Sequence, residues 1–254
     1  MSKKIHVLTI FPEIFSCVSE EGLLKVAKDR GAIEIFIHNL RDFTKDRHRT
    51  TDDTPYGGGA GMVMMAGPVI RGINDIESRF GRTFKVLFTP QGEPFNQKIA
   101  HFLANEEKQL LLIPAHYEGM DERITDHIDM ELSVGDFILS GGEIPAILVM
   151  DAVVRLLPNA LGNVSSLSEE SFENNLLEYP HYTRPNDING KKVPDILLSG
   201  HHENIRKWRL KESLKRTLIK RPDLILKHEF TDEEKSLLKE ITDELNSVVK
   251  EILK

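Results

Sequence analysis

The opening of the chain alternates between a strand pattern and a helix pattern, and this alternation limits the possible folds more than any other feature. Residues Lys4–Ile10 and Ala32–Leu40 are rich in apolar and β-branched residues, as strands are. Between them, Pro12 stands where a helix can begin and Gly31 where a helix can end. A strand, a helix and a second strand form a βαβ unit, whose strands lie parallel in a sheet covered by helices. The opening therefore predicts the α/β class.

The same alternation continues to about residue 157. The further elements expected there are helices over Gly67–Phe80 and Asn96–Glu107, strands over Thr83–Phe88, Gln109–Ile113 and Phe137–Leu139, and a buried apolar helix that begins near Pro145. A chain of this kind is long enough to bury a sizeable core without disulfides.

Each of these later strands is followed by a loop with glycine or polar residues: Thr89–Gly92, Pro114–Gly119 and Ser140–Gly142. In a parallel sheet the carboxyl ends of the strands meet at one edge, where ligands bind. Glycine lets the backbone adopt positive φ or approach another molecule closely. The pattern predicts that the three loops converge on one pocket. The alternative is that Ser140–Gly142 is only a tight turn inside an α/β core.

A second glycine-rich segment, Tyr56–Met62, follows the basic run Lys45–Arg49. Exposed backbone amides beside cations suit contacts with phosphate or ribose. The segment matches neither the dinucleotide fingerprint nor the P-loop, because Met62 replaces a required glycine and no Gly-Lys-Ser/Thr follows. A flexible loop without a ligand is the alternative.

Composition changes after Pro158, where small and polar residues replace the apolar pattern. We expect a first domain over residues 1–162, a linker over 163–172 and a small all-helical domain over 173–254. The helical domain should contain a main helix over His202–Lys220 and a last helix begun by a capping box of Thr231 and Glu234.

Charge is spread unevenly along the chain. The formal net charge is −7, yet residues 206–221 hold eight basic residues and one acid, Glu212. A local basic patch can attract a polyanion even on an acidic protein. A solvated helix face is the other interpretation of this run.

Several classes of protein are disfavoured by what the chain contains. Cys17 is the only cysteine, which excludes an intramolecular disulfide and fits a reducing compartment. The most continuous apolar run, Ile144–Val154, is too short and too interrupted to span a membrane, and the start resembles no signal peptide. No spacing of Cys or His matches a metal site. We expect a soluble, cytoplasmic protein with neither a metal site nor a membrane partner.

Six motifs in order along the chain carry a family resemblance: PYGGGAGM, TPQG, HYEGMDER, SVGDFILSGGEIPA, PHYTRP and SGHHENIRKWRLK. Together they resemble the bacterial tRNA (guanine(37)-N1)-methyltransferases, the TrmD family of the SPOUT superfamily. The resemblance implies a SPOUT-type parallel sheet with a deep trefoil knot around Ser133–Gly142, a homodimer whose active sites are shared between subunits, and S-adenosylmethionine as the methyl donor. It also implies a use of Mg²⁺, for which the sequence offers no set of protein ligands.

In this family the cofactor is held largely by backbone groups. Carried over by motif position, the cofactor-binding residues are Leu87, Phe88, Thr89, Pro90, Gly92, Ala115, Tyr117, Glu118, Gly119, Ser133, Val134, Gly135, Phe137, Leu139, Gly141, Gly142 and Pro145. The chain departs from the family at Ala115-His116, where Gly-Arg is usual.

The resemblance also implies two catalytic residues. Arg155 matches the arginine placed near O6 of the target guanine, and Glu170 aligns with the aspartate that removes the N1 proton. An ion pair with Asp151 is the simpler role for Arg155, and a solvated position in a linker is the simpler one for Glu170.

The positions that the family uses around the tRNA anticodon arm are Tyr56, Gly57, Gly58, Gly59, His181, Tyr182, Thr183, Arg184, Ser199, His202 and Arg209. Trp208 shares an apolar helix face with Ile205 and is expected to pack in the core. Two other functions remain open: a non-catalytic RNA-binding relative of the same fold, and a nucleotide-dependent α/β oxidoreductase.

Overall fold

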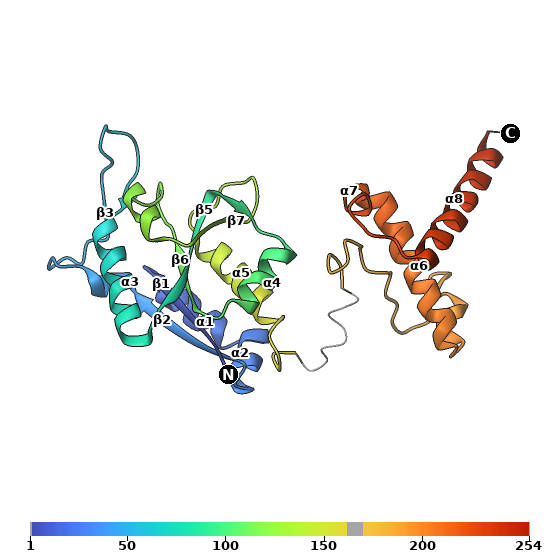
Figure 1. Ribbon diagram of the computed structural model, residues 1–254, viewed down its shortest axis with the longest axis horizontal. Helices are drawn as coiled ribbons and strands as arrows, with labels where there is room; N and C mark the ends of the chain where they lie inside the picture. The colour runs from blue at the N-terminus through green and yellow to red at the C-terminus, as the bar shows by residue number, and fades with distance from the viewer. Residues whose placement is uncertain (1, 162–169, 254) are drawn as a thin grey trace. The chain divides into compact units, whose positions relative to one another are not determined.

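The computed structural model describes residues 2–161 and 170–253, and the chain divides into two compact units, Met1–Val164 and Ser165–Lys254 (Figure 1). Most of the predicted linker, residues 163–172, lies outside the described residues, so its boundaries stay a prediction.

The first unit is built on a five-stranded parallel sheet with the order β2-β1-β6-β5-β7. Its strands are β1 (Lys3–Thr9), β2 (Ile33–Asn39), β5 (Thr83–Pro94), β6 (Gln109–Pro114) and β7 (Met130–Ser133). Its helices are α1 (Pro12–Ser19), α2 (Gly22–Asp29), α3 (Ala66–Phe80), α4 (Gln97–Asn105) and α5 (Glu143–Val154), with the 3₁₀ turns η1 (Leu40–Phe43) and η2 (Glu122–His127). The parallel α/β prediction is confirmed.

The central strands are buried on both faces, which explains why they are apolar without alternation. On β6, Leu110 and Leu112 pack in one core cluster with α1, α2, α4 and α5. Leu111 and Ile113 point to the opposite face and pack in a second cluster with α3. Helices therefore cover the sheet on both sides, and only the strand ends are open to ligands.

One predicted strand is wrong. Phe137–Leu139 is not a strand but an exposed loop, and Ile138 is 81% exposed. The chain leaves β7 at Ser133 and turns at Gly135, whose φ is +143° and whose carbonyl accepts a hydrogen bond from the Phe137 N–H. An apolar run alone does not tell a strand from an exposed apolar loop.

A short antiparallel hairpin carries the glycine-rich segment. It pairs β3 (Asp52–Asp53) with β4 (Val63–Met64), and positive φ angles occur at Gly57, Gly58, Gly59 and Gly61. Tyr56 is fully exposed on this loop.

The second unit is mainly helical, with α6 (His202–Lys220), α7 (Pro222–Ile225) and α8 (Asp232–Ile252). A small hairpin of β8 (Asp187–Ile188) and β9 (Lys191–Lys192) and a 3₁₀ turn η4 (Asp195–Leu198) precede them. Leu214 of α6 packs against Leu237 and Ile241 of α8. The predicted capping box of Thr231 and Glu234 is confirmed. Among the described helices, none combines the length and apolarity needed to cross a bilayer.

Candidate active site

The three strand-end loops line one cavity of about 360 Å³ in the first unit. This confirms the predicted convergence of the three loops on one pocket, although the strand that precedes the third loop is β7 and not Phe137–Leu139. Of the predicted cofactor residues, the cavity is lined by Phe88, Thr89, Pro90, Ala115, Tyr117, Glu118, Gly119, Ser133, Val134, Gly135, Phe137, Leu139, Gly141, Gly142 and Pro145. Motif matching missed Gln91, His116, Met120, Leu132 and Ile138, which also line it.

The two remaining cofactor candidates lie behind this lining. Leu87 is buried in the core of β5, 5% exposed. Gly92 lies where the end of β5 crosses β7, and a Cβ there would come within 2.5 Å of the backbone of Glu131 and Leu132. These two residues shape the wall and are absent from the cavity lining.

Backbone packing holds the second and third loops together. The N–H of Gly142 donates to the carbonyl of Ala115 at 2.5 Å. A Cβ on Gly142 would lie 2.8 Å from the Ala115 nitrogen and 2.9 Å from the Cα of Pro114. Neither neighbour is a flexible side chain, so only glycine fits, and backbone packs directly against backbone at this point of the cavity wall.

The glycine-rich hairpin is hydrogen-bonded to the loop that contains Tyr117 and Glu118. The N–H of Glu118 donates to the carbonyl of Met62 at 3.0 Å, and the N–H of Met64 donates to the carbonyl of Gly119 at 2.9 Å. Burial, followed by the charge of Asp52, raises the pKa of the Tyr117 phenol, which therefore stays protonated at neutral pH. The Tyr117 hydroxyl donates a hydrogen bond to the carboxylate of Asp52, which connects this loop to the hairpin.

Arg155 does not reach this cavity within one chain. It follows the last residue of α5, whereas Gly142 precedes the first. At 1.5 Å per residue, the 12 residues of α5 separate the two helix ends by roughly 18 Å. The role of Arg155 near O6 of the target guanine, which the family resemblance implies, stays a prediction.

Glu170 belongs to the second unit, where it lines a separate cavity of about 860 Å³ together with Tyr179, His202 and Arg209. The guanidinium carbon of Arg209 lies 4.7 Å from the ring centroid of Tyr179, a cation–π geometry. The structure thus brings the proposed base together with two of the predicted RNA-binding residues.

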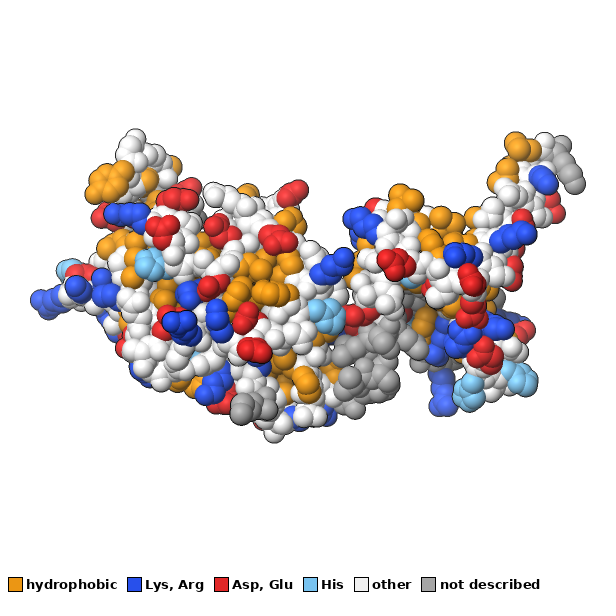
Figure 2. Space-filling model, in the orientation of Figure 1, with side chains coloured by type: hydrophobic (Ala, Val, Ile, Leu, Met, Phe, Trp, Pro, Cys, Tyr) orange, Lys and Arg blue, Asp and Glu red, His pale blue; other side chains and the backbone are white. Residues whose placement is uncertain are grey.

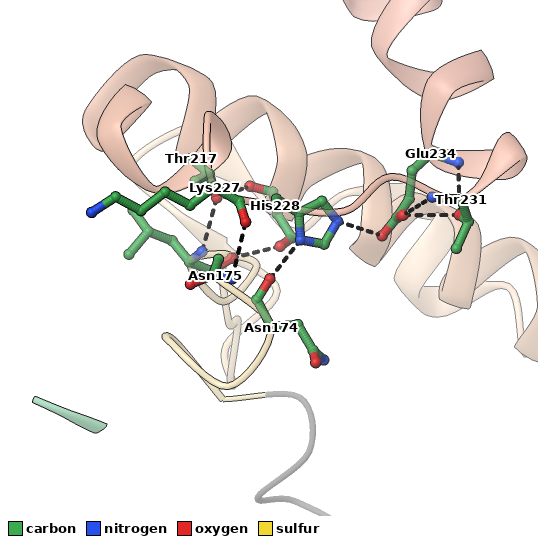
Figure 3. A network of polar contacts seen from close by, with 9 residues as sticks. Asn174, Asn175, Thr217, Lys227, His228, Thr231 and Glu234 are labelled. Atoms are coloured by element: carbon green, nitrogen blue, oxygen red, sulfur yellow. Dashed lines mark hydrogen bonds and ion pairs between the residues drawn. The ribbon is translucent and has the colours of Figure 1, made fainter. Parts of the chain in front are cut away.

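A polar network fixes one wall of this second cavity (Figure 3). Nδ1 of His228 lies 2.6 Å from the carbonyl oxygen of Asn174, and its Nε2 lies 3.2 Å from Oε1 of Glu234. The hydroxyl of Thr217 accepts a hydrogen bond from the Leu177 N–H at 2.8 Å. These contacts tie the segment after Glu170 to α6 and α8, so the backbone that carries Glu170 is anchored.

The other RNA candidates of the second unit lie outside this cavity. Nε2 of His181 lies 2.7 Å from Oε1 of Glu178, and the Tyr182 ring lies 6.4 Å from that of Trp208, which is half-buried. Thr183, Arg184 and Ser199 are exposed.

The basic run is less positive than its sequence indicates, because acids of neighbouring turns pair with it. Arg206 forms ion pairs with Glu203 and Glu233, and Lys211 with Glu240 and Glu244. Lys207, Lys215 and Lys220 form no ion pair with another described residue. The field available to a polyanion therefore comes from only part of the run.

In the portions of the chain that the structure describes, no three His, Cys, Asp or Glu side chains gather as they would around a metal ion.

Fold and cavity together define a class: a parallel α/β protein with a backbone-lined ligand site at the carboxyl ends of its strands, joined to a helical unit with cationic residues. Comparison with known proteins narrows this class. The family model described as tRNA (Guanine-1)-methyltransferase TrmD matches residues 3–227. The chain belongs to this family.

Named relatives agree over almost the whole chain. The tRNA (guanine-N(1)-)-methyltransferase of Dictyoglomus turgidum is 52% identical over 238 residues, which cover 94% of this chain and 96% of the relative. That of Brevibacillus brevis is 50% identical over 239 residues, covering 94% and 98%. The crystal structure of the tRNA (m1G37) methyltransferase from Aquifex aeolicus is similar with a TM-score of 0.73 and 42% identity, covering 89% of this chain and 96% of that one.

Proposed function

We propose that this chain transfers a methyl group from S-adenosylmethionine to N1 of guanosine 37 of tRNA, next to the anticodon. The observation that carries the proposal is the cavity of the first unit, which is lined by all but two of the cofactor positions implied by the motifs. Membership in the family supports the reaction.

The cavity fits a cofactor held by peptide groups. Because Gly142 has no Cβ, the Pro114–Gly119 loop and the Ser140–Gly142 turn come into direct contact. Residues of both loops line the cavity. When bound, S-adenosylmethionine supplies an electrophilic methyl group on a sulfonium. The tasks left to the protein are to orient the acceptor base, to remove the N1 proton and to stabilise the charge that develops on O6.

Glu170 is the candidate for proton removal and Arg155 for stabilising O6. General-base catalysis contributes about 10²–10⁴-fold, and a cation at a developing oxyanion contributes comparably. Neither residue lines the cofactor cavity of its own chain. We propose that two copies of the chain complete the site, as in the homodimer that the family resemblance implies.

Helix α5 supplies an apolar surface suited to such a dimer. It is apolar on all sides, yet Ile144 is 59% exposed and Leu148 is 46% exposed in the single chain. Figure 2 shows apolar side chains gathered on the exposed face of the first unit. An apolar helix surface left in water favours burial against a partner.

Mixing two inactive variants tests whether each active site is shared between two subunits. Gly142→Ala disables the cofactor cavity and Glu170→Ala removes the base, so a mixed dimer has one site with both functions intact. Recovery of methyl transfer after mixing and refolding the two variants supports a shared site. If the mixture recovers no activity, Glu170 and the cavity act within one chain or not at all.

We propose that the anticodon arm of tRNA contacts the exposed Tyr56 loop and the cationic residues of the second unit. Aromatic rings stack on splayed bases and cations hold phosphates in such complexes. The deep knot is supported by the close passage at Gly92 and Gly142. With no metal cluster among the described residues, any Mg²⁺ that the reaction uses would arrive with the RNA. Because tRNA is the substrate, we place the protein in the cytoplasm.

Methyl transfer to tRNA transcripts with and without guanosine at position 37 tests the function directly. Transfer that depends on this base supports it. Tight binding of both S-adenosylmethionine and tRNA without transfer would instead identify a non-catalytic relative, and calorimetric binding of NAD in place of S-adenosylmethionine would identify an oxidoreductase.

A further inference from the structure

A histidine and a buried glutamate connect two of the loops around the cofactor cavity. Nδ1 of His116 lies 3.3 Å from Oε2 of Glu143. Glu143 is the first residue of α5 and is 5% exposed, whereas His116 lines the cavity itself. The contact thus joins the loop after β6 to the start of α5.

His116 is held from several other directions. Its backbone N–H lies 3.1 Å from Sδ of the buried Met64. Its ring meets the ring of Phe11 edge-on, with 4.9 Å between centroids, and the ring of Tyr117 at 4.8 Å. These neighbours fix the direction in which the imidazole points.

The glycine turn closes over this pair without room for a side chain. His116 and Gly141 form an isolated antiparallel bridge. A Cβ on Gly141 would lie 2.2 Å from Oε2 of Glu143 and 2.3 Å from Nδ1 of His116. The position of the turn is therefore set by the two side chains beneath it.

Glu143 is only half satisfied. Its Oε1 is buried and has no hydrogen-bond partner among the described residues. A buried carboxylate oxygen without a donor destabilises the folded state, because it has lost its hydrogen bonds to water. Placement in the first turn of α5 offsets part of this cost, because the helix N-terminus is positive. A carboxylate kept in so unfavourable a position indicates a role beyond filling space.

We propose that His116 and Glu143 form a positioning pair that sets the spacing between the Pro114–Gly119 loop and the Ser140–Gly142 turn, and thereby the affinity for S-adenosylmethionine. The inference rests on the proposed function of the cavity. The pair touches no reacting atom, so it acts on cofactor binding through the peptide groups of the two loops.

Cofactor affinity of the purified full chain, measured by calorimetry, tests the pair. His116→Ala and Glu143→Gln should each weaken S-adenosylmethionine binding about 10-fold, since a small displacement of positioning groups has large effects. The double variant should bind no more weakly than His116→Ala alone, because both changes break the same contact. In steady-state assays the KM for S-adenosylmethionine should rise while the KM for tRNA stays constant.

Rescue separates positioning from general stability. An arginine offers several N–H donors where the imidazole offers one toward Glu143, so His116→Arg should keep or improve cofactor affinity. His127→Ala and Glu122→Gln, at exposed positions of η2, are the matched controls and should change neither affinity nor melting temperature.

Three results would overturn the proposal: unchanged affinity in both single variants, additive losses in the double variant, or losses that follow the melting temperature of the free protein with no rescue by arginine. Failure of the unaltered chain to bind S-adenosylmethionine would instead overturn the proposed function, and this inference with it.

Discussion

The two cavities of this chain are built from different parts of the polypeptide. The cavity of the first unit, about 360 Å³, is bordered by two loops whose backbones pack directly against one another at Gly142. The cavity of the second unit, about 860 Å³, is lined by long polar side chains such as Glu170, Arg206 and Arg209. From this difference we expect cofactor binding to depend on main-chain packing, and the steps that involve the RNA to depend on individual charges.

The largest effect should come from removing one of those charges. Glu170→Ala should lower single-turnover methylation by about 10²–10⁴-fold, because a general base is lost. Calorimetry should find S-adenosylmethionine affinity nearly unchanged, since no residue of the first cavity is altered. Arg155→Ala should behave in the same way.

Glu122→Gln is a suitable control for this comparison, because Glu122 is exposed on η2. Near-normal single-turnover methylation by Glu170→Ala would remove Glu170 from the reaction.

The converse test adds a single methyl group at Gly142, which should impair the cavity of the first unit and leave that of the second unit unaltered. In Gly142→Ala the new Cβ meets the backbone of Ala115 and Pro114. A displacement of about 1 Å can cost about 100-fold, and we expect a loss of this size in S-adenosylmethionine affinity by calorimetry.

Gly67→Ala on α3 is the matched control, because its Cβ would meet only the tip of the flexible Arg71 side chain. Equal affinities of the Gly142 and Gly67 variants would contradict the view that main-chain packing builds the cofactor site.

Acid should weaken the two units in different pH ranges. His6 is fully buried on β1, with Nδ1 3.0 Å from Nε2 of His38 on β2. Burial lowers the pKa of His6, and burial together with the charge of His6 lowers the pKa of His38 to about 4. Folding therefore favours the neutral rings. This stabilisation is present above the unfolded value of 6.5 and is lost as the pH falls from 6.5 toward 4.

In the second unit, Glu234 has a linkage of the same sign, over a lower pH range. Burial opposes its ionisation, but hydrogen bonds from Thr231 and the nearby His228 lower its pKa below 4.5. Its contribution is present above pH 4.5 and is lost only below it. Hydrogen exchange between pH 6.5 and pH 4.5 should thus show faster opening of β1 and β2 before any change due to Glu234 at the start of α8. His38→Gln should flatten the response of the first unit, and a response unchanged by this variant would rule out the histidine pair as its cause.

The smallest expected effect is on tRNA binding, and it should distinguish cations that form ion pairs with carboxylates from cations that do not. Lys207→Ala should weaken tRNA binding a few-fold and reduce the slope of log affinity against log salt by about 1, as for one lost phosphate contact. Lys211→Ala should have less effect, because Glu240 and Glu244 already neutralise Lys211. Filter binding across a salt series measures both. Equal slopes for the two variants would show that the ion pairs of α6 do not persist in solution.

The sequence predicts those parts of the molecule that local pattern determines. The strands β5 and β6, the helix α6 and the capping box at Thr231 follow from periodicity and local hydrogen bonding, and all are present. The convergence of the strand-end loops follows from the rule that parallel strands share a carboxyl edge. The motif match also identified fifteen of the twenty residues that line the cavity, and the five that it missed include His116, where the chain departs from the family pattern.

The remaining features depend on tertiary neighbours that no local pattern encodes. Phe137–Leu139 has the composition of a strand, but Gly135 turns the chain before it, and the run ends exposed. The charge of the α6 run was overestimated, because the acids of α8 that neutralise Lys211 lie 29 and 33 residues away in sequence. Arg155 follows α5 and so lies a helix length from the glycine turn that precedes this helix, and its role at the guanine stays a prediction.

The glycines at the wall of this cavity also affect how readily resistance to an inhibitor of the site could arise. Resistance usually arises when a side chain that touches the inhibitor, but not the natural ligand, is exchanged for another. At Gly92 and Gly142 there is no side chain to exchange, and any replacement collides with the backbone of neighbouring segments. A compound that bound only to these peptide groups would leave the protein few substitutions that exclude the drug and still admit the cofactor.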